Sequence, residues 1–169
     1  MRKIAITGHR EYEDIFNAGT QTNKLFKYLR TKYPNEEIVF ITGGAQGIDQ
    51  LVAKMCKQQK FLYDVYLAFP FDISTSRWAQ SHKDFLTDLI VTSRNTKYIN
   101  DIYSVRGYYL RDKAMVDDSD FVVAFWDGRK KGGTYITVKY ALSKGKLVYN
   151  AFNEFKEIKS EDVEVTSSA

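Results

Sequence analysis

The chain has 169 residues, a net charge of +4 and a hydrophobic fraction of 44%, values that are typical of one globular domain and that exclude disorder over most of the length. A single cysteine and two histidines exclude an internal disulfide and a Cys/His zinc site. The positive charge permits a polyanionic partner without identifying one.

Five short apolar runs predict β-strands along the chain. They are rich in β-branched and aromatic residues, and most are apolar throughout rather than alternating, which is typical of strands buried on both faces of a parallel sheet. The expected strands are Ile4–Ile6, Ile38–Ile41, Tyr63–Phe69, Phe121–Trp126 and Leu147–Tyr149.

Helical patterns lie between these runs. The expected helices are Thr20–Tyr33, Gly47–Gln58, Trp78–Thr92, Tyr108–Asp117 and Tyr135–Ser143. Strands that alternate with helices build right-handed βαβ units. The sequence therefore predicts a single α/β domain over residues 1–152, in which a doubly wound, mainly parallel sheet is flanked by helices. Ligands of such folds bind outside the carboxyl ends of the strands.

Two segments do not fit this alternation. Asn95–Val105 contains only a weak strand signal in a polar setting, and we expect a loop there. Residues 153–169 turn acidic and then small and polar, so we expect a partly flexible C-terminal tail. The first residues form a strand pattern without the apolar core of a signal peptide, and no apolar run has the length of a membrane span. We expect a cytoplasmic protein that contacts no membrane.

The turn after the first strand reads Thr7-Gly8-His9-Arg10. Gly8 allows a ligand to approach the backbone closely, His9 can titrate near neutral pH, and Arg10 can clamp a phosphate or carboxylate. The alternative is a tight strand-to-helix turn with two exposed polar residues.

The turn after the second strand contains three glycines. It lacks the G-x-G-x-x-G dinucleotide fingerprint and the Gly-Lys-Ser/Thr of a Walker A loop. Its candidate ligand-binding residues are Gly43, Gly44, Ala45, Gly47 and Asp49. Asp49 can accept a hydrogen bond from a ribose hydroxyl, or it can simply stabilise the helix dipole.

Further candidates follow the third strand and precede the fourth. Pro70 stiffens the exit from the sheet, and Trp78 offers a flat face for a base or covers the edge of the core. Arg111 can point its guanidinium toward the strand ends. The acidic cluster Asp117–Asp120 lies at the opposite end of the fourth strand, where a helix-terminating loop is favoured over a metal site.

The turn after the fourth strand joins an apolar strand to a helix through glycines and a hydroxyl. Its candidates are Asp127, Gly132, Gly133 and Thr134. Glycines let backbone N–H groups approach a phosphate, and the helix N-terminus adds a favourable dipole. Asp127 can act as a base or hold a sugar hydroxyl, or it can form the turn before Gly128.

The order and placement of these motifs resemble the SLOG superfamily. This Rossmann-like group includes the lonely-guy phosphoribohydrolases and the DNA-processing A proteins. The resemblance covers roughly residues 3–150 and is strongest to the YpsA-like branch, which is found in Gram-positive bacteria and their phages. It implies a Rossmann-like fold and a pocket for a nucleotide or nucleotide derivative between the glycine turns.

The resemblance leaves the catalytic residues open. In lonely-guy enzymes an arginine and a glutamate just after the Gly-Thr turn support cleavage of the N-glycosidic bond. Arg111 matches the arginine, but Tyr135, Ile136 and Thr137 follow Thr134 where the glutamate would stand. Arg111, Asp127 and Asp49 are the catalytic candidates.

The leading hypothesis is therefore a binding protein for a nucleotide or a nucleotide-derived signal such as an ADP-ribose species, without a metal or cofactor. The alternatives are a nucleotide N-glycosidase and, less favoured, a single-stranded DNA-binding protein. Because related proteins often dimerise, the resemblance also implies a homodimer.

Overall fold

Seven strands form one sheet in the computed structural model, which describes residues 1–11 and 15–164. The strand order is β4-β3-β2-β1-β5-β6-β7, and every neighbouring pair is parallel except β6 and β7. The strands are β1 (Arg2–Gly8), β2 (Ile38–Thr42), β3 (Leu62–Leu67), β4 (Asn95–Tyr98), β5 (Phe121–Phe125), β6 (Val148–Asn150) and β7 (Lys156–Glu157).

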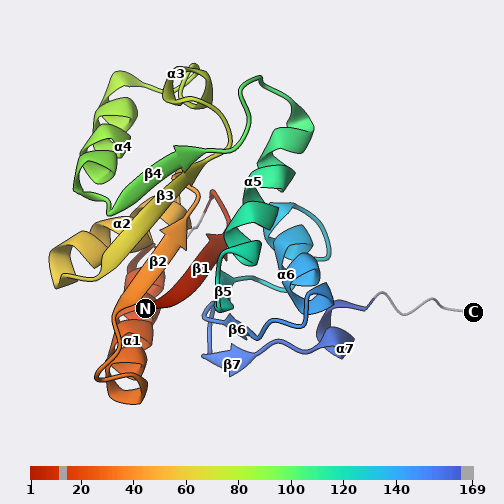
Figure 1. The fold of residues 1–169 in the computed structure, drawn as a ribbon. Coiled ribbons are helices and arrows are strands. Elements are labelled where there is room, and N and C mark those ends of the chain that lie inside the picture. The colour runs from red at the N-terminus through yellow and green to blue at the C-terminus, as the bar shows by residue number, and fades with distance from the viewer. Residues whose placement is uncertain (12–14, 165–169) are drawn as a thin grey trace, which may run out of the picture.

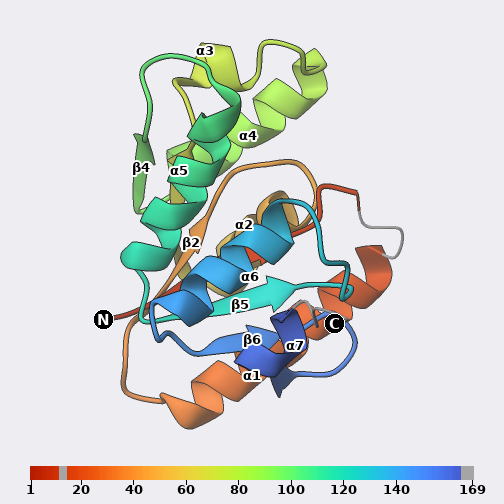
Figure 2. The same ribbon diagram turned by 90° about the vertical axis from the view of Figure 1, so that its right-hand side faces the viewer.

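Helices cover both faces of this sheet (Figures 1 and 2). They are α1 (Ile15–Lys32), α2 (Ile48–Gln59), α3 (Phe71–Ser74), α4 (Gln80–Thr92), α5 (Val105–Asp117), α6 (Gly133–Ser143) and α7 (Ser160–Val163). Residues of α1, α2 and α4 share one buried cluster, and residues of α5, α6 and α7 share a second. The α/β class and the Rossmann-like doubly wound arrangement are therefore confirmed.

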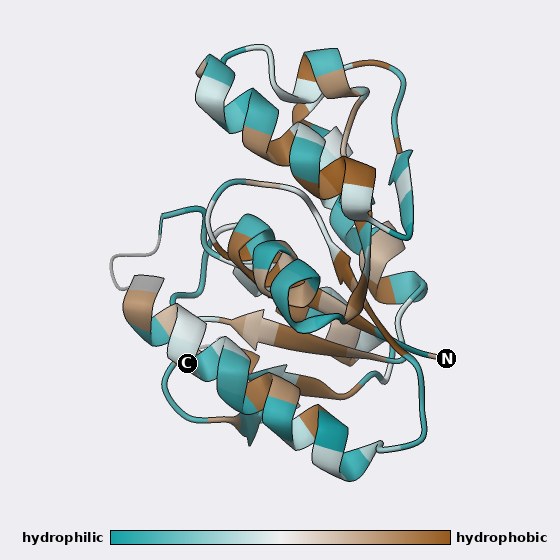
Figure 3. Ribbon diagram, turned by 90° about the vertical axis from the view of Figure 1, so that its left-hand side faces the viewer, coloured by the Kyte–Doolittle hydropathy of each residue, from teal (hydrophilic) through white to brown (hydrophobic). Residues whose placement is uncertain are grey.

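The two clusters follow from the period of a strand, in which successive side chains point to opposite faces. Ile4 and Ile6 belong to the first cluster, and Ala5 between them belongs to the second. Figure 3 shows the result, with hydrophobic central strands and hydrophilic outer helix faces. Burial on both faces explains why the strands read as continuous apolar runs.

The order in which successive strands are added to the sheet reverses between β1 and β5. From β1 it proceeds through β2 and β3 to β4, then returns to place β5 on the other side of β1. The two strands pair in register from Ile4 with Phe121 to Gly8 with Phe125. A switch point of this kind opens a crevice at the carboxyl ends of the two strands, and ligands bind there in doubly wound folds.

The expectation of a loop over Asn95–Val105 is wrong in part. Asn95–Tyr98 forms the edge strand β4, which pairs with β3 from Asp64 to Leu67. Three of its four side chains are exposed, so its sequence carries none of the apolar signal of the central strands. The helix expected from Tyr108 begins earlier, at Val105, because Ser104 accepts a hydrogen bond from the Gly107 N–H and caps it.

The C-terminal segment packs against the sheet in its described part. β7 pairs with β6, and Ile158 and Val163 are buried in the second cluster. The fraying expected near the end falls on residues 165–169, which lie outside the described residues. Within residues 1–11 and 15–164, no helix is long and apolar enough to span a membrane.

Candidate functional site

A cavity of about 720 Å³ lies at the switch point. The end of β1, the inner face of α5 and the start of α6 form its walls. Among the residues predicted from the sequence, those that line it are Gly8, His9, Arg10, Ala45, Asp49, Arg111, Gly132, Gly133 and Thr134. The structure therefore brings together residues from three separate turns.

Gly47 lets the turn after β2 pack closely against the turn after β1. Gly47 has a φ of +93°, and a Cβ added to it would lie 2.4 Å from the carbonyl oxygen of Arg10. Any other residue would strain the backbone and push the two turns apart. Gly47 lines neither this cavity nor the next, so its place in the site is structural support for the turn that carries Arg10.

Arg111 is buried and ties three elements together. Its Nη1 donates to the carbonyl oxygens of Gly43, at 2.6 Å, and Tyr66, at 3.3 Å. Its Nε donates to Asp112 Oδ1 at 2.7 Å. The guanidinium is thus fixed between α5, β3 and the turn after β2, and within the described residues no partner bonds to Nη2. This arrangement places a preorganised cation at the cavity wall.

Asp49 is a buried carboxylate in the same wall. Its Oδ2 accepts a hydrogen bond from the Ala45 N–H at 3.2 Å. A Cβ added to Gly43 would lie 2.7 Å from this oxygen and 2.6 Å from Arg111 Nη1, so the carboxylate and the guanidinium crowd the same glycine. Burial raises the pKa of Asp49 to about 6, and the charge of Arg111 opposes that rise. Asp49 therefore changes its charge at a higher pH than an ordinary aspartate does.

The N-terminus of α6 opens into the larger cavity. Gly132 precedes the helix with a φ of +90° and, as a glycine, supplies no side-chain cap to its first turn. Gly133 and Thr134 both line the cavity. The first N–H groups of a helix have no partner within it, and the helix dipole favours a negative charge beside them. This end of the cavity has the chemistry of an anion site.

Asp127 lies beside this cavity without lining it. Arg129 Nε donates to Asp127 Oδ2 at 2.8 Å, and these hydrogen bonds from Arg129 lower the pKa of Asp127. The Asp127 N–H donates to His9 Nε2 at 3.3 Å, so the proton of a neutral His9 lies on Nδ1. Burial lowers the pKa of His9, although Asp127 opposes this effect. Asp127 instead lines a separate cavity of about 460 Å³ that extends to α7.

A smaller cavity of about 260 Å³ adjoins the larger one. The turn after β2, the end of β3 and the α3–α4 region enclose it. Its lining includes Gly43, Gly44 and Trp78, which the sequence predicted, and Ser74 and Tyr108, which it did not. Pro70 lines neither cavity, but its carbonyl accepts hydrogen bonds from the N–H groups of Ile73 and Ser74 and starts the short helix that carries Ser74.

Several cavity residues lay outside the sequence predictions. On α5, Val105, Tyr108, Tyr109, Asp112 and Met115 face the larger cavity together with Arg111. Tyr108 and Met115 stand three and four residues from Arg111, and this spacing is the available signal, because such residues share one helix face. Within the part of the chain that the structure describes, no group of three or more His, Cys, Asp or Glu side chains could hold a metal ion.

A family model described as YspA SLOG family matches residues 4–155. No curated protein matches the chain. Solved structures with similar folds include DNA processing protein A (DprA) from Streptococcus pneumoniae, with 17% identity over 89% of this chain and 50% of that one, at a TM-score of 0.69. DprA from Helicobacter pylori shows 15% identity over 88% and 64%, at a TM-score of 0.63. The protein TM1055 shows 16% identity over 88% and 72%, at a TM-score of 0.56. The chain thus spans half to two thirds of the two DprA proteins.

Proposed function

The chain belongs to the YpsA family of SLOG proteins, and on this premise we propose that it binds a nucleotide or nucleotide derivative in the cavity between β1 and β5. One observation carries the proposal. The N-terminus of α6, whose N-cap residue is a glycine, opens into a cavity at the switch point of the sheet, where doubly wound folds bind their ligands.

The charge of the cavity supports an anionic ligand. Its lining contains four arginines and three carboxyl groups. Arg111 is paired with Asp112, and Arg129 with Asp127. Arg10 and Arg106 have no carboxylate partner within residues 1–11 and 15–164. Their charges, together with the α6 dipole, favour a phosphate over a neutral ligand.

Titration calorimetry against a panel of nucleotides tests the proposal. Arg106→Gln removes an exposed charge at the cavity rim and should weaken binding several-fold without changing stability. Arg77→Gln is the matched control, because Arg77 is exposed and lines neither of the two adjoining cavities. Failure of every nucleotide to bind the folded protein, or equal weakening in both variants, would reject the site.

A nucleotide N-glycosidase is the second candidate, and Asp49 favours it. Cleavage of the glycosidic bond by water gives free base and a ribose phosphate, and a carboxylate near the sugar stabilises the oxocarbenium character of the transition state. Among the described residues, Asp49 is a buried carboxylate that lines the larger cavity beside Arg111. Incubation with nucleoside monophosphates should release free base in the wild type and not in Asp49→Asn. Binding without any release would exclude this activity.

Single-stranded DNA is a third ligand class, suggested by the relatives alone. The Helicobacter pylori DprA structure concerns a single-stranded DNA binding mode, and its likeness to this chain is one of fold. If the chain binds DNA, oligonucleotide affinity should fall steeply with salt concentration. The absence of any binding at low salt would remove this alternative.

A further inference from the structure

We propose that two copies of the chain associate through the edge strand β4, which pairs antiparallel with its own copy and joins the two sheets into one. This interface does not depend on the proposed ligand. Three features of the described residues carry it: the free edge of β4, the exposed apolar side chains before and after the strand, and the charges along it.

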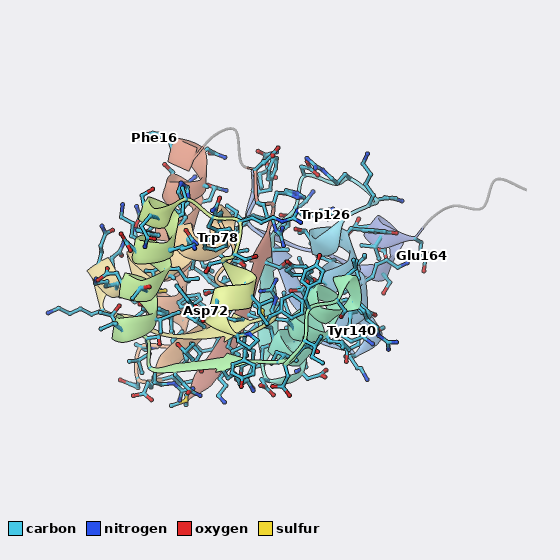
Figure 4. All side chains as sticks on the ribbon, turned by 90° about the horizontal axis from the view of Figure 1, so that it is seen from above. Phe16, Asp72, Trp78, Trp126, Tyr140 and Glu164 are labelled. Atoms are coloured by element: carbon cyan, nitrogen blue, oxygen red, sulfur yellow. The ribbon has the colours of Figure 1, made fainter. Side chains whose placement is uncertain are left out.

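β4 stands at one end of the sheet. Asn95–Tyr98 pairs with β3, and the strand order places no further strand beside it. In Figure 2, and as the green arrow at the lower margin of Figure 4, β4 lies at the border of the molecule with no helix or strand of the described residues beyond it. Because peptide groups alternate in direction along a strand, some of those in β4 point away from β3. Unpaired groups of this kind are a template for another strand.

The usual protections of an edge strand are weak in β4. Edge strands avoid pairing through a proline, a bulge or an outward lysine. β4 contains no proline, and its register with β3 is continuous. Its one charged residue, Lys97, places Nζ 3.1 Å from Asp118 Oδ2 and 4.2 Å from the centre of the Tyr66 ring. The lysine charge is therefore directed onto its own chain and does not guard the free edge.

Exposed apolar side chains lie on both sides of the strand. Val91 precedes β4 and is 75% exposed, Tyr98 ends it and is 51% exposed, and Ile102 follows it and is 79% exposed. An antiparallel pair carries the residues that follow β4 in one copy toward those that precede it in the other. Ile102 thus approaches Val91 of the partner subunit, and the twofold axis repeats the contact.

These side chains supply the area that the strand lacks. A stable dimer buries roughly 800 Å² of each partner, and β4 has only four residues. Clustered exposed apolar side chains mark interaction surfaces. A second copy is the occupant that fits, because it presents the same free edge with the same apolar residues in reverse order.

The charges favour one register of the pair. The helix-covered faces of the two sheets stay aligned only if a residue lies opposite its own copy, and the two central residues of β4 are Thr96 and Lys97. An axis at Lys97 sets two lysines directly opposite each other, which destabilises a strand pair. An axis at Thr96 instead sets Lys97 opposite Asn95 of the partner subunit.

The same register sets Tyr98 opposite Arg94 of the partner subunit. Nε and Nη2 of Arg94 bond to the Asp64 carboxylate, so the edge of the guanidinium is occupied and its planar faces are left for stacking. A guanidinium on the face of a tyrosine ring is an attractive contact. Charge and shape therefore agree on the axis at Thr96.

A cysteine at the axis tests the register. Opposite Cα atoms of an antiparallel pair lie roughly 4.5–5.5 Å apart, within the reach of a disulfide. Thr96→Cys should form a covalent dimer under mild oxidation, and the native Cys56 is buried and does not compete. Ser143→Cys, at an exposed position on α6, is the matched control and should not cross-link.

Sedimentation velocity over a wide concentration range tests the interface in the unmodified chain. The wild type should reach twice the mass of one chain and dissociate on dilution. Ile102→Asp should weaken the dimer at least tenfold. Phe16→Asp makes the same kind of change at an exposed apolar residue of α1 and should not weaken it. A thermal melt establishes that each variant is folded.

Two results overturn the proposal. One is a wild type that stays monomeric at every concentration, with no cross-link in Thr96→Cys. The other is a dimer that Ile102→Asp and Phe16→Asp affect equally and that Thr96→Cys does not cross-link, because such a dimer uses another face.

Discussion

Replacing Asp49 with asparagine should stabilise the protein, and increasingly so as the pH rises. The carboxyl group is 8% exposed, and burial raises its pKa from 3.8 to about 6. The hydrogen bond from the Ala45 N–H can be kept by the asparagine side-chain oxygen. The substitution therefore removes a buried charge while leaving its main polar contact in place.

The magnitude follows from the two pKa values. A tenfold change in proton affinity corresponds to about 1.36 kcal/mol, so charging Asp49 in the fold costs about 3 kcal/mol. Because the pKa is higher in the folded state than in the unfolded one, this cost is absent below pH 4. It grows as the pH rises and is complete above pH 7. The free energy of unfolding of the asparagine variant should exceed that of the wild type by roughly 1.5 kcal/mol at pH 5 and about 3 kcal/mol at pH 8.

Urea unfolding of both proteins at pH 5, 6, 7 and 8 measures the difference directly. The expected result is a gap in the free energy of unfolding that widens with pH. A difference in the free energy of unfolding that does not change with pH would refute the assignment of Asp49 as a buried carboxylate with a raised pKa. A wild type that is more stable than the variant at pH 8 would refute it as well. Such a carboxylate reduces stability, and this is the usual mark of a functional group.

Two further predictions concern the support of the site. Gly107→Ala should cost about 1–3 kcal/mol, because its Cβ would lie 2.3 Å from Phe69 Cε1. Gly19→Ala, where nothing lies within 4 Å, should instead gain up to about 1 kcal/mol, and equal effects in urea unfolding would contradict the close packing of α5 on Phe69. Arg94→Ala should cost about 3 kcal/mol, since it leaves the buried Asp64 carboxylate without its partner at 2.5 Å. Arg2→Ala, which breaks the more exposed pair with Glu36, should cost less, and the reverse order would be inconsistent with a buried ion pair.

Most of the fold could be predicted from the sequence because its central strands are buried on both faces. The five apolar runs correspond to β1, β2, β3, β5 and β6. β4 was missed because an edge strand with polar, exposed residues such as Lys97 has no apolar pattern. α3, β7 and α7 have only two to four residues each, too few for any periodicity to appear.

The glycine turns of the site were recognisable because each follows an apolar strand and precedes a helix. The orientation of single side chains was not. Arg129, two residues after Asp127, binds its carboxylate and holds it outside the larger cavity. Tyr108 forms part of both cavities, yet in the sequence it reads only as an aromatic residue of a helix. The orientation of such side chains depends on which neighbours they contact in the fold, and the periodicity of the sequence does not show these contacts.

The most direct test of nucleotide binding is a crystal structure of the protein with a bound nucleotide. We expect a phosphate of the ligand within hydrogen-bond distance of the backbone N–H groups at Gly133 and Thr134. A nucleotide bound elsewhere, for example in the cavity between Asp127 and α7, would contradict the proposed site.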